Sequence, residues 1–351
     1  MSIHRSPAGW RLLAAGGAVT TAAGAARLAY SVLNRHAPGG TKTWSRTNHR
    51  GEPVTLLEGP AVALGAIAGV LAEAVALAGG GTSRWRAGSA IAIAGAGAAA
   101  FGAYDDLRGT ADRRGFRGHL GALRHGEMTT GAAKLGGIGA TGIASAVLAG
   151  GSPTDLVINA GLVAGGANLL NLFDLRPGRA IKVAAASAAL IAAASAALIA
   201  AAGSARNGRG RALITVPPLA AALAPLPPLA AALALLPEDL GERAMLGDAG
   251  ANALGAMLGA AAAALPRSAR LVMLAGIAGL TAASEKVSFT KVIERTPALH
   301  KLDMLGRRPA DPVPTVRIPV QRHRLHDAMS VNGSGTTARS AENNDIAPAE
   351  E

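Results

Sequence analysis

Long apolar runs separated by short polar stretches dominate the sequence. Nine runs approach the length of about 20 residues that an α-helix needs to cross a bilayer. They cover roughly residues 9–33, 55–79, 87–104, 132–150, 155–172, 180–203, 212–236, 246–265 and 269–284. Because the bilayer core holds no water to satisfy backbone polar groups, each run is predicted to be helical. The pattern therefore predicts an all-α, polytopic integral membrane protein with about nine transmembrane helices and cytoplasmic active-site loops.

Two of the runs have features of their own. The first follows Arg5 and Arg11 and continues past Arg27 without a convincing cleavage site, which favours a retained helix over a signal peptide. The seventh contains a set of prolines, Pro217, Pro218, Pro225, Pro227 and Pro228. Proline lacks an N–H and clashes with the preceding turn, so this run is predicted to kink or to divide into two half-helices.

Composition narrows the class of protein. Half of the 351 residues are hydrophobic, mean hydropathy is +0.30 and only 16% are charged, against about 25% charged in soluble domains. These values argue against a soluble enzyme. The net charge of +12 accompanies only 3% aromatic residues, so basic loops beside anionic lipid explain it better than a nucleic-acid partner. The absence of cysteine excludes disulfides and thiolate chemistry.

Charge in the loops predicts the orientation. The loops after the first, third, fifth and seventh runs carry more Lys and Arg than the opposite loops, and the segment from residue 285 adds more to the same side. By the positive-inside rule, that side is cytoplasmic and the N-terminus lies outside. The chain is thus predicted to be a multi-pass protein of the cytoplasmic (inner) membrane. Residues 1–306 form the membrane domain, and 307–351 form a polar cytoplasmic tail, disordered at least from about residue 331.

Acidic residues beside membrane helices are costly and are candidates for function. Asp105 and Asp106 close the third run, where a divalent cation would relieve their repulsion, although a solvated helix end would leave the same pattern. Asn168, Asn171 and Asp174 close the fifth run at spacings of three, which places them in one helical stripe. Such a stripe suits a cation or a sugar nucleotide, and it equally suits hydrogen bonding between helices.

The third acidic group opens the eighth run, where Asp248 precedes Asn252 by one turn. An ordinary helix cap explains a lone carboxylate there. The three groups together, all at helix ends on one predicted side, favour a function. Oxygen ligands suit Mg²⁺, which binds one or two carboxylates together with substrate phosphates. Basic residues beside them suit an anionic substrate, and phosphoryl transfer depends mainly on positioning and charge neutralisation.

The order of these groups resembles the polyprenyl-phosphate N-acetylhexosamine-1-phosphate transferase superfamily. This superfamily includes phospho-N-acetylmuramoyl-pentapeptide transferase and the undecaprenyl-phosphate GlcNAc-1-phosphate transferases. The counterparts of its motifs are Asp105-Asp106, Lys134 in GAAKLGG, the stripe ending at Asp174, Asp248 in GDAG, and His300 in TPALHKLDMLGR. The resemblance covers about residues 10–306 and rests on five motifs in the family's order.

The resemblance implies an enzyme, a glycosyl-1-phosphate transferase that depends on Mg²⁺. A polyprenyl (undecaprenyl or decaprenyl) phosphate would attack the β-phosphate of a UDP-amino sugar at the cytoplasmic face and release UMP. The product, a lipid-linked sugar, would supply synthesis of a cell-envelope polymer. Family members are often dimeric, so a homodimer is a further expectation.

The resemblance also implies roles for individual residues. Asp105 or Asp106 would position or deprotonate the lipid phosphate, Lys134 would contact phosphate, and Asp248 with Asp174 would bind Mg²⁺. The substrate-binding candidates are Asn168, Asn171, Asp174, Arg176, Arg179, Asn252, His300, Arg46 and Arg50. The first cytoplasmic loop occupies the family's substrate-loop position, and its candidate phosphate contacts are Arg46, Asn48 and Arg50. A positive-inside loop is an equal interpretation of them. Arg176 and Arg179 could bind a diphosphate or simply mark a cytoplasmic helix end.

The sequence departs from the family pattern at several places. Leu175, Arg176 and Pro177 follow Asp174 and remove the motif's second aspartate. Ala251 replaces its serine, His300 is all that is left of a histidine cluster, and no further apolar span follows. Two alternatives stay open. The first is an inactive homologue that binds polyprenyl phosphate or scaffolds envelope assembly. The second is a transporter with a site near mid-membrane on broken helices.

Overall fold

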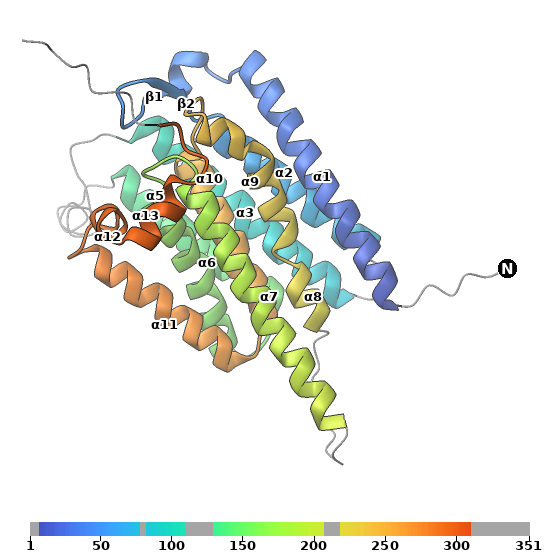
Figure 1. The fold of residues 1–351 in the computed structure, drawn as a ribbon. Coiled ribbons are helices and arrows are strands. Elements are labelled where there is room, and N and C mark those ends of the chain that lie inside the picture. The colour runs from blue at the N-terminus through green and yellow to red at the C-terminus, as the bar shows by residue number, and fades with distance from the viewer. Residues whose placement is uncertain (1–6, 78–81, 110–128, 207–217, 310–351) are drawn as a thin grey trace, which may run out of the picture. The chain divides into compact units, whose positions relative to one another are not determined.

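A computed structural model describes residues 7–77, 82–109, 129–206 and 218–309. The predicted tail from residue 307 therefore lies outside the described residues from 310 onward. The described chain is a helical bundle with one small hairpin (Figure 1). Its elements are α1 (Pro7–Arg35), η1 (Thr41–Trp44), β1 (Ser45–Thr47), β2 (Pro53–Thr55), α2 (Glu58–Ala76), α3 (Thr82–Arg108), α5 (Thr130–Ala149), α6 (Pro153–Phe173), α7 (Arg179–Arg206), α8 (Pro218–Leu223), α9 (Leu226–Leu240), α10 (Gly247–Ala261), η3 (Ala262–Ala264), α11 (Arg267–Ser284), α12 (Phe289–Arg295) and α13 (Pro297–Met304).

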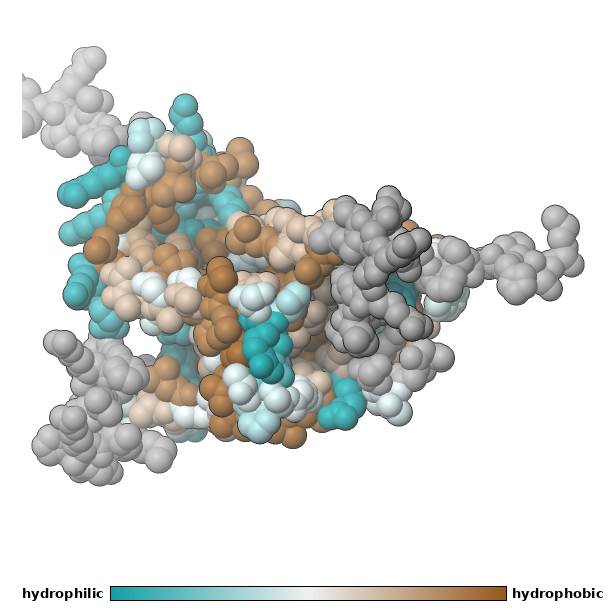
Figure 2. Space-filling view, turned by 90° about the horizontal axis from the view of Figure 1, so that it is seen from below, coloured by the Kyte–Doolittle hydropathy of each residue, from teal (hydrophilic) through white to brown (hydrophobic). Residues whose placement is uncertain are grey.

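The all-α membrane architecture is confirmed, and the count of nine spans stays a prediction. Within the described ranges, seven helices are long and apolar enough to cross a membrane, or eight if the bent pair α11 and α12 is one span. Large apolar side chains point outward along these helices; Leu28 is 66% exposed, Val157 68% and Leu190 69%. Figure 2 shows apolar residues over much of the visible described surface. A soluble monomer rarely exposes so much apolar area, which indicates a bilayer environment.

Helix α10 is the centre of the bundle. It packs against α2, α3, α6, α7 and α9, and every residue from Ala249 to Ala261 is buried. The sequence GDAGANALGAMLGAA allows this because small side chains let neighbouring backbones approach closely. The eighth predicted span is therefore a 15-residue helix enclosed by other helices. The proline-rich seventh run does divide, with α8 ending before Pro225 and α9 beginning at Leu226.

The β1–β2 hairpin closes one end of the bundle. The strands pair antiparallel, with Ser45 opposite Thr55, and Thr55 also bridges to Ala244 just before α10. Trp44 is buried beneath the hairpin with Leu56 and Leu57. In Figure 1 the hairpin and α13 lie toward the same end of the bundle. The first predicted cytoplasmic loop is thus an ordered element fixed to the entrance of α10.

Gly102 brings α3 against the first turn of α10. A Cβ atom at this position would overlap the backbone carbonyl of Asp248 and the Cα of Ala249. We expect Gly102→Ala to separate the two helices and to lower stability by about 1–3 kcal/mol, the usual cost of overpacking. A lower thermal unfolding midpoint in detergent would show this. Gly136→Ala is the matched control, since nothing lies within 4 Å of its added Cβ; equal midpoints for the two variants would contradict the prediction.

Candidate functional site

One ammonium joins two carboxylates from distant parts of the chain. Lys134 Nζ lies 2.7 Å from Asp105 Oδ2 and 2.5 Å from Asp248 Oδ2. The three side chains are 16%, 16% and 23% exposed, in the order Lys134, Asp105, Asp248. Asp105 lies in the last turn of α3, Lys134 in the first turns of α5 and Asp248 at the start of α10. We call Asp105, Lys134 and Asp248 the charged triad.

Asp106 has a different structural role from its neighbour Asp105. Its Oδ1 accepts a hydrogen bond of 3.0 Å from the Asp248 amide, and its Oδ2 one of 2.9 Å from the Ala249 amide. A carboxylate in this place satisfies two of the free N–H groups at a helix N-terminus and complements the helix dipole. Arg46 donates to the Asp106 carbonyl. Asp106 therefore caps α10 from α3, whereas Asp105 points to Lys134.

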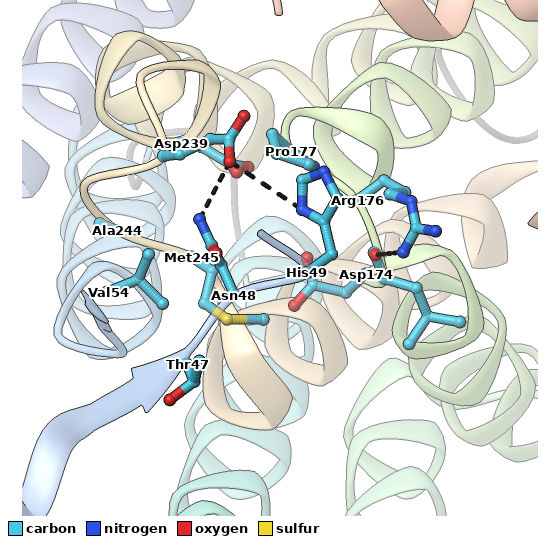
Figure 3. Close-up of a pocket in the computed structure, with 12 residues that line it drawn as sticks. Thr47, Asn48, His49, Val54, Asp174, Arg176, Pro177, Asp239, Ala244 and Met245 are labelled. Atoms are coloured by element: carbon cyan, nitrogen blue, oxygen red, sulfur yellow. Dashed lines mark hydrogen bonds and ion pairs between the residues drawn. The ribbon is translucent and has the colours of Figure 1, made fainter. Parts of the chain in front are cut away.

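A cavity of about 170 Å³ opens beside the start of α10 (Figure 3). Its lining consists of Thr47, Asn48, His49, Val54, Asp174, Leu175, Arg176, Pro177, Asp239, Glu242, Ala244 and Met245. Asp174 and Asp239 are buried, at 8% and 2% exposure. We call this cavity the polar pocket; it is lined by more carboxyl groups than guanidinium groups.

Glu242 holds the hairpin loop over the polar pocket. It is 4% exposed and has a φ of 56°, an unusual backbone conformation for a residue with a side chain. Its Oε2 accepts a hydrogen bond of 2.9 Å from Asn48, and its Oε1 lies 3.0 Å from Arg50 Nε. His49 Nδ1 is 3.9 Å from the same carboxylate. Glu242 therefore fixes three consecutive residues of the loop.

Two titratable groups of the pocket have shifted pKa values. Burial raises the pKa of Asp174 well above its usual range, and the carboxyls of Asp239 and Asp106 add to the rise. Burial lowers the pKa of His49 below 6.5; the Glu242 carboxylate opposes this change, and neighbouring guanidinium groups reinforce it. Both shifts favour the neutral form.

The structure places the other predicted substrate residues in different surroundings. Arg176 lines the polar pocket. Arg50 binds Glu242 and donates to the carbonyls of Arg308 and Pro309. Arg179 is 3% exposed, and its guanidinium binds both carboxylate oxygens of Asp303 at 2.7 and 3.0 Å.

The asparagine candidates and His300 also lie in different surroundings from one another. Asn168 donates to Thr281 Oγ1 at 3.3 Å, which links α6 to α11. Asn171 is half-buried in the last turn of α6. Asn252 is 1% exposed, and its Nδ2 has no hydrogen-bond partner within the described part of the chain. His300 is exposed on α13, and the polar pocket is lined by His49 from the hairpin loop instead.

Several residues at this end were not among the sequence candidates. They are His49, Glu58, Asp239, Glu242 and Asp303. Glu58 is fully buried at the start of α2, and neither of its carboxylate oxygens has a hydrogen-bond partner in the described chain. A signal was present, since the segment PEDLGER after the seventh run contains Asp239 and Glu242 at a helix end. The contacts of Glu242 with the hairpin loop join residues that are nearly 200 positions apart in the sequence.

The arrangement of the carboxylates shows where the expected Mg²⁺ ion could be held. Among the residues that the structure describes, no group of three or more His, Asp or Glu side chains is arranged to hold a metal. Asp105 and Asp248 nevertheless converge on one position, which the Lys134 ammonium shares. A pair of carboxylates fits Mg²⁺, because this ion keeps several waters and takes its remaining ligands from substrate phosphates.

Comparisons with known proteins add no assignment. No family model matches the chain, and no curated protein matches it significantly.

Removing the ammonium from the charged triad should leave two carboxylates without their counterion. We expect Lys134→Met to lower stability by about 1–3 kcal/mol, the cost of leaving buried polar groups without partners. The double variant Lys134→Met with Asp248→Asn should lose less than the sum of the two single changes, with a coupling of about 0.5–3 kcal/mol. Thermal unfolding in detergent measures this, with exposed Lys42→Met as control. Additive losses would argue against the contact.

The lowered pKa of His49 has a consequence for stability. Between its folded value and 6.5 the unfolded chain binds more protons than the folded chain, so stability should fall as the pH drops below 6.5. We expect His49→Gln to remove part of this acid-side loss and to leave stability at about pH 8 little changed, since the imidazole is neutral in both states there. Titration of the ¹⁵N-labelled imidazole gives the folded pKa directly. A value above 6.5 would contradict the prediction.

Proposed function

We propose that this protein is a Mg²⁺-dependent enzyme that transfers a sugar-1-phosphate from a UDP-amino sugar to a polyprenyl phosphate and releases UMP. The observation that carries the proposal is the charged triad. Its three residues belong to separate motifs of the resemblance, with Lys134 and Asp248 standing 114 positions apart, and the fold brings all three into contact. A lysine between two carboxylates at a helix-bundle end is an arrangement suited to phosphate chemistry.

The site divides into a part that holds two bases and a pocket that is lined mainly by carboxyl groups, which indicates how a sugar nucleotide would lie. Lys134 and Arg46 are the bases on the side of the α10 cap, where a diphosphate bound together with Mg²⁺ would find positive charge. The polar pocket is lined by Asp174, Asp239 and Glu242 and by the single guanidinium of Arg176, so it offers a phosphate little positive charge. We therefore assign the pocket to the uncharged hydroxyl- and amide-bearing part of the donor.

In the proposed reaction, an oxygen of the lipid phosphate attacks the β-phosphorus of the donor. A new P–O bond forms, the bond from the β-phosphorus to the bridging oxygen breaks, and the electron pair leaves with UMP. Lys134 holds a phosphate oxygen, and Asp105 positions the lipid phosphate or accepts its proton. Asp248 and Asp105, with Asp174 nearby, would hold Mg²⁺. When bound, the ion supplies neutralisation of phosphate charge.

One observation favours a second candidate. Lys134 already pairs with both Asp105 and Asp248, so each carboxylate has a partner without a metal. A homologue that binds polyprenyl phosphate without turnover would be stable in this form, and Pro177 stands where the family pattern has an aspartate. A transporter is disfavoured, because the triad lies at helix ends and a transport site is expected near mid-membrane.

The test is UMP release by the purified full-length protein in detergent. The assay contains polyprenyl phosphate, Mg²⁺ and each member of a panel of UDP-amino sugars. We expect UMP formation that requires lipid and Mg²⁺ and that falls about 100-fold or more in Asp248→Asn and Asp105→Asn, since each removes a charged group from the reacting centre. Exposed Glu285→Gln serves as the matched carboxyl control and should keep full activity.

The outcome also separates the two candidates. Protein that retains polyprenyl phosphate during purification but forms no UMP with any donor would reject the transferase and favour the non-catalytic homologue. UMP formation that is unchanged in Asp248→Asn would place the chemistry elsewhere.

A further inference from the structure

Near the C-terminal end of the described chain, helix α12 turns sharply away from the direction of α11. Helix α12 is turned by 94° from α11, and the break lies between Ser284 and Phe289. Helix α11 carries outward-facing apolar side chains along its length; Leu271 is 48% exposed, Val272 73% and Leu280 44%. If α11 crosses the bilayer with this surface toward lipid, α12 must run close to the membrane plane.

Specific contacts fix α12 and α13 in this position. The Phe289 ring stacks on Phe173 at the end of α6, with centroids 5.0 Å apart and an angle of 10° between the planes. Asp303 of α13 is held by Arg179 of α7, and Lys182 Nζ donates to its carbonyl at 2.6 Å. Within the segment itself, Asp303 also pairs with Arg307 at 2.8 Å. The inner face of this segment is therefore occupied by contacts with the rest of the protein.

The outer face combines apolar and basic side chains. The exposed apolar residues are Val292 at 40%, Leu299 at 43%, Leu302 at 62% and Leu305 at 68%. Between residues 285 and 305 the exposed bases include Lys286, Lys291, Arg295 and Lys301, and the exposed acids are Glu285 and Glu294. Leu302 and Leu305 are three positions apart and are the most exposed of these apolar residues, and Lys301 lies beside Leu302, so they form an outward stripe. Leu299 lies nearer the side of the buried Asp303, four positions on, and is less exposed.

We propose that α12 and α13 form an interfacial anchor that binds the anionic headgroups of the adjoining bilayer leaflet. The apolar stripe would enter the headgroup–acyl boundary, and the bases would meet lipid phosphates. Helices that lie in the interface have this combination of an apolar face and a Lys/Arg-rich polar face. Continuity with the outward apolar surface of α11 favours lipid as the occupant over a second copy of the chain. The anchor does not depend on the proposed transferase activity.

The anchor is also linked to the rim of the polar pocket. Arg308, just after α13, binds both carboxylate oxygens of Glu52 in the hairpin loop at 2.6 and 3.1 Å. Arg307 Nη2 lies 3.4 Å from His49 Nε2. Headgroup binding at α13 thus acts on a segment that contacts the loop carrying His49.

The absence of native cysteine allows a direct test by single-cysteine spin labelling. Full-length Leu302→Cys, reconstituted in phosphatidylcholine vesicles with and without phosphatidylglycerol, reports depth from collision with oxygen or with a water-soluble nickel chelate. Leu64→Cys, on the outward face of α2 at 54% exposure, gives the lipid reference. Lys42→Cys in exposed η1 gives the aqueous reference. We expect the Leu302 label to resemble the Leu64 label, and more strongly so in anionic vesicles.

A charge variant separates headgroup recognition from simple apolar contact. The double variant Lys291→Gln with Lys301→Gln should lower the preference of the anchor for anionic over neutral vesicles by about fivefold for each base removed. The matched pair Arg35→Gln with Lys42→Gln, two exposed bases outside the anchor, should leave it unchanged. Three results would overturn the proposal: an aqueous Leu302 label in both vesicles, equal depth regardless of lipid charge, or spin–spin broadening that shows a second copy on this face.

Discussion

The N-terminus of α10 is the constraint around which the rest of this end is arranged. A helix leaves its first N–H groups without internal partners, and enclosing that terminus in a bundle makes the loss expensive. Asp106 meets the need by accepting hydrogen bonds from the backbone amides of Asp248 and Ala249. Doing so fixes the end of α3 against α10. Asp105, the preceding residue, is then directed to Lys134, so the cap determines where the charged triad forms.

Ion pairs hold several of the acidic residues at this end. Asp105 and Asp248 share one ammonium, Glu242 pairs with Arg50, and Asp303 pairs with Arg179. Glu58 and part of Asp239 lack such partners in the described chain. Structural pairs stabilise a fold, but they do not require a cavity lined with further carboxyls beside them. The excess of acid at the polar pocket is therefore not accounted for by these pairs, and the proposed ligand site would account for it.

The sequence predicts the all-α membrane class because hydropathy and backbone satisfaction act locally, whereas the predicted count of nine spans is not confirmed. It also predicts that Asp105, Lys134 and Asp248 belong together, although only through a resemblance in motif order. It cannot separate Asp105 from Asp106, since their different tasks follow from how α3 meets α10. His49 was missed for a similar reason: a histidine in a short hairpin loop has no periodic pattern, and its place in the pocket depends on Glu242. Arg179 was predicted from its neighbours to contact substrate, whereas its guanidinium binds Asp303.

Small residues connect the membrane fold to the chemistry of the site. Apolar side chains gain little by leaving lipid for a protein interior, so α10 is held mainly by close packing and by polar contacts at its ends. Gly102 on α3 and Gly59 on α2 allow both helices to reach the first turn of α10. Larger residues would hold the helices apart, and the Asp106 oxygens would no longer reach the two amides. The glycines therefore help to position the charged triad as well as to pack the helices, because the geometry of the triad depends on the close approach of the α3 and α10 backbones.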